Sequence, residues 1–142
     1  MPGILIAMLS GALMSVQGVF NTQVTKNTSL WVSTSFVQFS ALAVCLIIWF
    51  FTDRHSFSGI LEVPNKYTLL GGVLGAFITV TVIKSIGSLG PARAAMLIVI
   101  SQLIVAYLIE LFGLFGMDKQ PLDWRKVGGM LLAITGIVIF KW

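Results

Sequence analysis

The sequence predicts an all-α integral membrane protein with five transmembrane helices. Hydrophobic residues make up 57% of its 142 residues and charged residues only 10%, whereas a soluble domain of this size carries roughly a quarter charged residues. The mean hydropathy is +0.98. Apolar runs near the length of about 20 residues needed to cross a bilayer recur along the whole chain. These features exclude a water-soluble globular protein and a disordered chain.

Each of five apolar segments predicts one crossing helix, and together they form a single domain over residues 1–142. The predicted helices span approximately residues 3–20, 30–51, 68–86, 91–112 and 124–141. Between the third and the fourth, Gly90 suits a turn and Pro91 suits a first helical position. The fifth segment is continuously apolar only over residues 127–140, but flanking Lys, Arg and Trp side chains can extend it by snorkelling.

The aromatic residues and the loops agree with this division. Tryptophans lie close to predicted helix ends, where an amphipathic ring prefers the head-group level: Trp31, Trp49, Trp124 and Trp142. The longest connections, residues 52–67 and 113–123, are too short to fold as separate domains. No soluble part is left over to carry an enzymatic activity.

The distribution of Lys and Arg does not select an orientation in the membrane. Five crossings place five basic residues on the side of the N-terminus: Arg54, Lys66, Lys119, Arg125 and Lys126. The other side receives four: Lys26, Lys84, Arg93 and Lys141. The positive-inside rule needs a clear excess, so either these small counts are noisy or the chain inserts both ways and pairs with its inverted copy. An inverted pair would form a ten-helix bundle with the inverted repeat of many secondary transporters.

A polar face on the first helix is the first candidate substrate-binding surface. Ser10, Met14, Gln17 and Asn21 follow spacings of four, three and four, which place them on one narrow face. This face suggests a cavity, although Gln17 could instead form a hydrogen bond with a neighbouring helix. Gln102 joins these candidates because it lies about 16 Å along the fourth helix, close to the middle of a bilayer core.

Small residues in the helices predict helix packing. Glycines let helix backbones approach closely in lipid, and six of them are candidates for such contacts: Gly11, Gly18, Gly71, Gly75, Gly129 and Gly136.

Ionisable residues provide few candidates for chemistry. Glu110 is the one acid inside a predicted span, so it is either an ion-coupling residue or half of an interfacial salt bridge to Arg125 or Lys126. A single histidine and a single cysteine form neither a metal cluster nor a catalytic constellation. The sequence predicts no metal, no cofactor and no enzymatic activity. Its scattered basic residues give no reason to expect nucleic acid as a partner.

Several short segments resemble the five-helix YdcZ-like family of the drug/metabolite transporter superfamily. The matching residues are Gly11, Gln17-Gly18, Asn21, Val37-Gln38-Phe39, Gly71-Gly72, Gly75, Ser101-Gln102-Leu103, the run from Glu110 to Gly116, Pro121, Arg125 and Gly136. The resemblance spans nearly the whole chain and is most specific from Ser101 to Gly116. It implies a multi-pass protein of the bacterial inner membrane that works as an antiparallel dimer, of itself or with an oppositely oriented paralogue. The family pattern commonly has Asp where this chain has Glu110.

These observations favour a secondary transporter, an exporter of a small metabolite or drug-like compound that works by alternating access in an inverted dimer surrounded by membrane lipid. A glutamine-lined site with no buried carboxylate favours a neutral, zwitterionic or weakly anionic ligand over a hydrophobic cation. Two alternatives remain: a flippase for a lipid-linked substrate, and a non-transporting scaffold or regulatory subunit. A polar face accessible to water would favour transport, and one buried in helix contacts would favour a scaffold.

Overall fold

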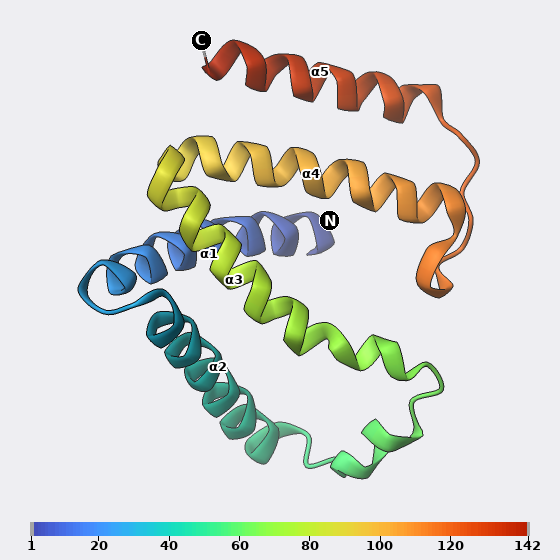
Figure 1. Cartoon of the computed structure of the whole chain (residues 1–142). Coiled ribbons are helices and arrows are strands. Elements are labelled where there is room, and N and C mark those ends of the chain that lie inside the picture. Colours follow the sequence, from blue (N-terminus) through green and yellow to red (C-terminus); the bar gives the residue numbers. More distant parts are fainter. Residues whose placement is uncertain (1, 142) are drawn as a thin grey trace. The chain divides into compact units, whose positions relative to one another are not determined.

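The computed structural model describes residues 2–141, and every regular element in that range is helical (Figure 1). Its α-helices are α1 (Pro2–Asn27), α2 (Leu30–Thr52), α3 (Gly71–Leu89), α4 (Pro91–Phe112) and α5 (Trp124–Lys141). Short 3-10 helices occupy the two longer loops: η1 (Phe57–Glu62), η2 (Lys66–Leu70) and η3 (Leu114–Gly116). The prediction of an all-helical protein is confirmed.

Four helical segments in residues 2–141 are long and apolar enough to cross a bilayer. They are α1, α2, residues 66–89 and α4. Helix α5 has 18 residues, of which three are basic, Arg125, Lys126 and Lys141, and it is not among these four segments. The fifth crossing stays a prediction.

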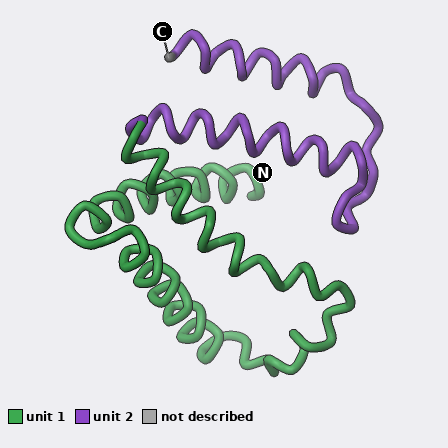
Figure 2. Tube along the Cα trace, viewed as in Figure 1, with its two compact units in different colours: residues 1–88 green, residues 89–142 purple. Residues whose placement is uncertain are grey.

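Backbone contacts divide the chain into two compact units, residues 1–88 and residues 89–142 (Figure 2). Unit 1 contains α1, α2 and nearly all of α3. Unit 2 contains α4 and α5, which run antiparallel beside each other (Figure 1).

Helix α1 continues seven residues beyond the predicted end at Phe20. The apolar run ends there, but helical hydrogen bonding does not depend on apolar side chains. The hydroxyls of Thr22 and Thr25 each donate to the carbonyl oxygen four residues earlier, at 2.8 Å. Polar side chains thereby satisfy their own hydrogen bonds and leave the helix intact up to Asn27. Ser29 then caps α2 by accepting a hydrogen bond from Val32 N at 3.3 Å.

The predicted limits of the third helix, residues 68–86, are wrong by three residues at each end. Residues before Gly71 form the tighter η2 instead. At the other end α3 continues through Gly87 to Leu89, and the Ser88 hydroxyl donates to Lys84 O at 2.9 Å without interrupting it. The turn that remains is a single residue with positive φ, Gly90 with φ +81°, followed by Pro91 at the start of α4.

Helix α1 packs against α3 at Gly18. A Cβ atom on Gly18 would lie 2.6 Å from Ile86 Cδ1 and 3.2 Å from Val82 Cγ1, whereas one on Gly11 would have no neighbour within 4 Å. Gly18 is therefore small because α3 lies against it.

We expect Gly18→Leu to destabilise the protein by about 1 to 3 kcal/mol, because a branched side chain would overpack the contact between α1 and α3. Gly11→Leu is the matched control, since it gives the same gain in helix propensity at an open position. Thermal unfolding of the two purified variants in detergent measures the difference. Equal melting temperatures would show that the α1–α3 contact contributes nothing to stability.

In unit 2 the loop between α4 and α5 is held at both ends. Gly113 ends α4 in the left-handed conformation, with φ +64°. Gln120 N donates to Glu110 O at 2.8 Å, and Asp123 N donates to the Tyr107 hydroxyl at 3.1 Å. These bonds fold the loop back so that α5 begins beside the end of α4.

Three of the four tryptophans lie near helix ends as the sequence predicts, and Trp142 lies outside the described residues. Trp31 and Trp124 are exposed. Trp49 is half-buried; its Nε1 donates to His55 O at 3.0 Å, and its ring lies 4.8 Å from that of Phe57. The start of the loop after α2 is therefore packed onto the end of that helix.

Candidate functional site

The predicted polar face of α1 borders a hollow in unit 1. The hollow is open and measures about 430 Å³, and Met14, Gln17 and Asn21 line it together with the apolar residues Leu13, Val16 and Phe20. Ser10 does not line it, so that part of the prediction is wrong. The exposed Ser10 hydroxyl donates to Ile6 O at 3.0 Å. Three of the four candidates on this face thus share one surface, which is largely apolar with two amide groups.

Asn21 stands at the buried end of this face. Only 8% of its surface is exposed. Its backbone carbonyl oxygen accepts hydrogen bonds from Thr25 Oγ1 at 2.8 Å and from Ser33 Oγ at 3.1 Å. Ser33 is fully buried and joins α2 to α1 through this bond. The sequence reasoning missed Ser33, although the run Ser33-Thr34-Ser35 in the first turns of α2 is a signal for a buried polar contact.

The amides of Gln17 and Gln102 have no hydrogen bond within the described part of the chain. Both residues are exposed. By contrast, every buried side-chain nitrogen or oxygen in the same range has a partner. The two glutamines therefore present their hydrogen-bonding groups outward from their own unit.

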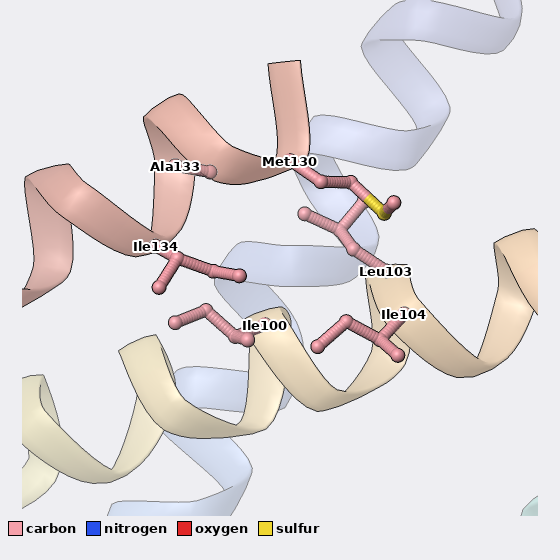
Figure 3. A pocket seen from close by; sticks show the side chains of 6 residues that line it. All are labelled: Ile100, Leu103, Ile104, Met130, Ala133 and Ile134. Carbon is pink, nitrogen blue, oxygen red and sulfur yellow. The ribbon is translucent and has the colours of Figure 1, made fainter. Parts of the chain in front are cut away.

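Gln102 lies on the side of α4 turned away from α5. Its neighbours Ile100 and Leu103 face α5 (Figure 3), and successive residues of a helix differ by about 100° in direction. The adjacent Ser101 hydroxyl satisfies itself by donating to Leu97 O at 3.0 Å. Of Ser101 and Gln102, only Gln102 therefore has a side-chain polar group free to bind another molecule.

Glu110 is paired with Lys126. Its Oε2 accepts a hydrogen bond from Lys126 Nζ at 3.0 Å, and both side chains remain about half exposed. Lys126 Nζ also lies 5.8 Å from the centre of the Tyr107 ring. Arg125, the other basic residue considered, has its backbone N bonded to Asp123 Oδ1 at 2.8 Å. The structure thus contains one of the two salt bridges that the sequence left open.

This pair predicts a small effect of Glu110→Gln on stability. Exposed ion pairs contribute little because water screens them and holding two long side chains together costs entropy. We expect the melting temperature to fall only slightly, and to fall by the same amount in Lys126→Gln and in the double variant. A large loss of stability in Glu110→Gln, without a similar loss in Lys126→Gln, would show that Glu110 has a second role, such as ion coupling.

The glycines predicted to pack differ in their surroundings. Besides Gly18, Gly75 has a neighbour: a Cβ on it would lie 3.7 Å from Gln38 Nε2 of α2. The remaining four have open space around them in the described chain: Gly11, Gly71, Gly129 and Gly136. A packing role for these four would require another chain or lipid.

No group of three or more His, Cys, Asp or Glu side chains that could hold a metal ion occurs in residues 2–141. Cys45 is a free, exposed thiol on α2. At the candidate sites of the described chain, the polar groups are amides, hydroxyls and the Glu110–Lys126 pair.

Comparison with known proteins agrees with this arrangement of apolar helices. Residues 2–139 match the family described as "Putative inner membrane exporter, YdcZ". The chain is 25% identical over 95 residues to the inner membrane protein YdcZ of Escherichia coli strain K12; the alignment covers 67% of this chain and 64% of that relative's length. No solved structure matches. The match confirms the resemblance seen in the sequence. The chain belongs to the YdcZ family, and it is a multi-pass protein of the inner membrane.

Proposed function

We propose that the chain exports a small molecule by alternating access, in an inverted dimer of two five-helix subunits. The observation that carries this proposal is the pair of unpartnered amides, Gln17 and Gln102, inside long apolar helices. Membership of a family described as exporters supports transport and implies a protein that is not an enzyme.

An amide in hydrocarbon without a hydrogen bond is costly. Gln17 is the sixteenth of the 26 residues of α1, and Gln102 is the twelfth of the 22 residues of α4, so both lie far from the helix ends. Their hydrogen bonds must come from a second chain, from water or from a solute. A transport path supplies water and solute at this depth.

Inverted pairing explains why the two sides of the membrane carry nearly equal numbers of basic residues. It would also bring the Gln102 side chains of the two copies to a similar depth near the midplane. Many transporters with inverted repeats bind their substrate at that level. We therefore assign Gln102, Gln17, Asn21 and Met14 to the lining of the path.

The chemistry of these residues favours a neutral or zwitterionic solute. Helix α1 contains no Asp or Glu, and Glu110 of α4 is occupied by Lys126. A bare lipophilic cation would find no carboxylate free to offset the loss of its hydration.

A thermal-shift screen of the purified full chain tests this function. The panel contains zwitterionic amino acids, neutral nucleosides and sugars, and lipophilic cations. We expect at least one neutral or zwitterionic compound to raise the melting temperature with the logarithm of its concentration above its Kd, because a ligand at 100 times its Kd stabilises a protein by about 2.7 kcal/mol. Stabilisation by lipophilic cations alone would contradict the proposed solute class. A screen without any stabilising compound would favour a scaffold instead.

A further inference from the structure

A second hollow lies between α4 and α5, at the end of the two helices where Glu110 pairs with Lys126. It measures about 340 Å³ and has two parts. Glu110 and Lys126, next to the Tyr107 ring, form its charged part, and Leu103, Gly129 and Met130 form its apolar part. The exporter proposed above makes no use of this hollow.

The charged part presents a carboxylate and an ammonium group side by side. Glu110 Oε2 and Lys126 Nζ are 3.0 Å apart, and their side chains are 42% and 46% exposed. An ion pair with this much exposure is weakly held. A ligand that brings its own cation and anion can therefore replace the internal pair with two new ones. The complementary ligand is a zwitterion whose two charges are close together.

The apolar part continues along α4 and α5 towards the middle of the helices. Leu103 and Met130 also belong to the seam between the two helices, where they meet Ile100 and Ile134 (Figure 3). The seam leaves no room for a water molecule. The chemistry of the hollow thus changes from charged to apolar within one helical turn or two, as it does at the head-group boundary of a bilayer.

The position along the helices also corresponds to that boundary. Glu110 lies two residues before the end of α4, and Lys126 is in the first turn of α5. Trp124, at the start of α5, is 76% exposed, which is typical of the aromatic belt at the interface. A zwitterionic ligand that enters this hollow from the membrane is a lipid, and its acyl chains lie on the apolar part of the hollow.

We propose that this hollow binds phosphatidylethanolamine, with the lipid's ammonium group on Glu110, its phosphodiester on Lys126 and one acyl chain against Leu103, Gly129 and Met130. A primary ammonium group donates hydrogen bonds to the carboxylate, whereas the quaternary ammonium of phosphatidylcholine cannot. An anionic lipid such as phosphatidylglycerol can pair with Lys126 but leaves Glu110 without a cation. The proposal does not depend on transport.

Native mass spectrometry of the purified full chain tests the proposal. Phosphatidylethanolamine, phosphatidylcholine and phosphatidylglycerol with identical acyl chains are added one at a time. We expect phosphatidylethanolamine to bind about tenfold more tightly than phosphatidylcholine, the effect of one charge-assisted hydrogen bond. Soluble glycerophosphoethanolamine, which has the head group without acyl chains, should bind far more weakly. Equal binding of the two zwitterionic lipids, or binding of the soluble head group as tight as that of the lipid, would overturn the proposal.

A glycine pair in α5 provides the matched variants. Gly129 lines the hollow and Gly128 does not, and a Cβ on either would have no neighbour within 4 Å. Gly129→Leu should fill the hollow and remove the preference for phosphatidylethanolamine, while Gly128→Leu should keep it. If a folded Gly129→Leu protein keeps its full preference for phosphatidylethanolamine, the assigned site is contradicted.

The charged residue is tested separately. Glu110→Gln should bring the affinity for phosphatidylethanolamine down to that for phosphatidylcholine and should not weaken phosphatidylglycerol. Glu62→Gln, at an exposed position in η1, is the control for loss of one acid. Unchanged lipid preference in Glu110→Gln would refute the role of the carboxylate, and the glycine variants retain the test of the site if this variant does not fold.

Discussion

Both orientations of the unmodified chain are expected in the membrane, each in a substantial fraction of the molecules. The two predicted sides carry five and four basic residues, so the Lys/Arg distribution gives no preference. Cysteines introduced at Ser58 and at Ser88, which are exposed and lie on either side of the third predicted crossing, should each react partially with a membrane-impermeant maleimide in intact cells. The background is Cys45→Ala, which removes the native thiol.

Two added lysines should convert this mixture into one orientation. Lysines at Asn65 and Gln120 favour the cytoplasmic location of one side, and lysines at Asn27 and Thr28 favour the other. We expect nearly complete labelling of one cysteine and protection of the other, with opposite outcomes for the two sets. If the unmodified chain already inserts one way only, an inverted homodimer is excluded and the chain would need an oppositely oriented paralogue.

Gln102→Leu is expected to abolish ligand-induced stabilisation while dimer assembly is retained. A leucine side chain is stable in lipid. If Gln102 only lines a path, leucine can therefore replace it without loss of helix contacts. Thermal unfolding with the best compound from the screen, together with chemical cross-linking of the dimer, measures both properties. The expected loss is the whole of the ligand-dependent rise in melting temperature.

Ser101→Ala is the matched control for this substitution. Its hydroxyl is bonded to Leu97 O of its own helix, so its removal should leave both ligand response and assembly unchanged. Loss of the dimer in Gln102→Leu would show that the glutamine joins two helices through a hydrogen bond. That outcome would contradict its assignment to the path.

The existence of the helices could be predicted from the sequence, but several of their ends could not. Apolar runs mark the part of a helix that contacts lipid or other helices. Where a helix stops depends on its backbone hydrogen bonds and on residues that restrict the backbone, and hydroxyls such as those of Thr22, Thr25 and Ser88 bond to their own helix without interrupting it. The break at Gly90-Pro91 was predictable because those residues restrict the backbone directly.

The candidate site, like the helices, could be predicted from the sequence only in part. Helical spacing alone places Met14, Gln17 and Asn21 together, because all three lie on one helix. The bond between Ser33 and Asn21 O, and the choice of Lys126 over Arg125 as partner of Glu110, depend on how two helices pack. Such contacts between helices follow from tertiary structure and leave no periodic pattern in the sequence.

Water accessibility at position 102 tests the proposed transport path most directly. Gln102→Cys and Ile100→Cys, in the Cys45→Ala background, are each treated with a membrane-impermeant maleimide in proteoliposomes. Ile100 lies about 3 Å away along α4 and is half-buried in the seam with α5, so its cysteine should be labelled far less. A transport path predicts labelling of the cysteine at position 102, and protection of that cysteine by a stabilising compound from the screen. A cysteine at position 102 that is as unreactive as the one at position 100 would contradict the proposed function.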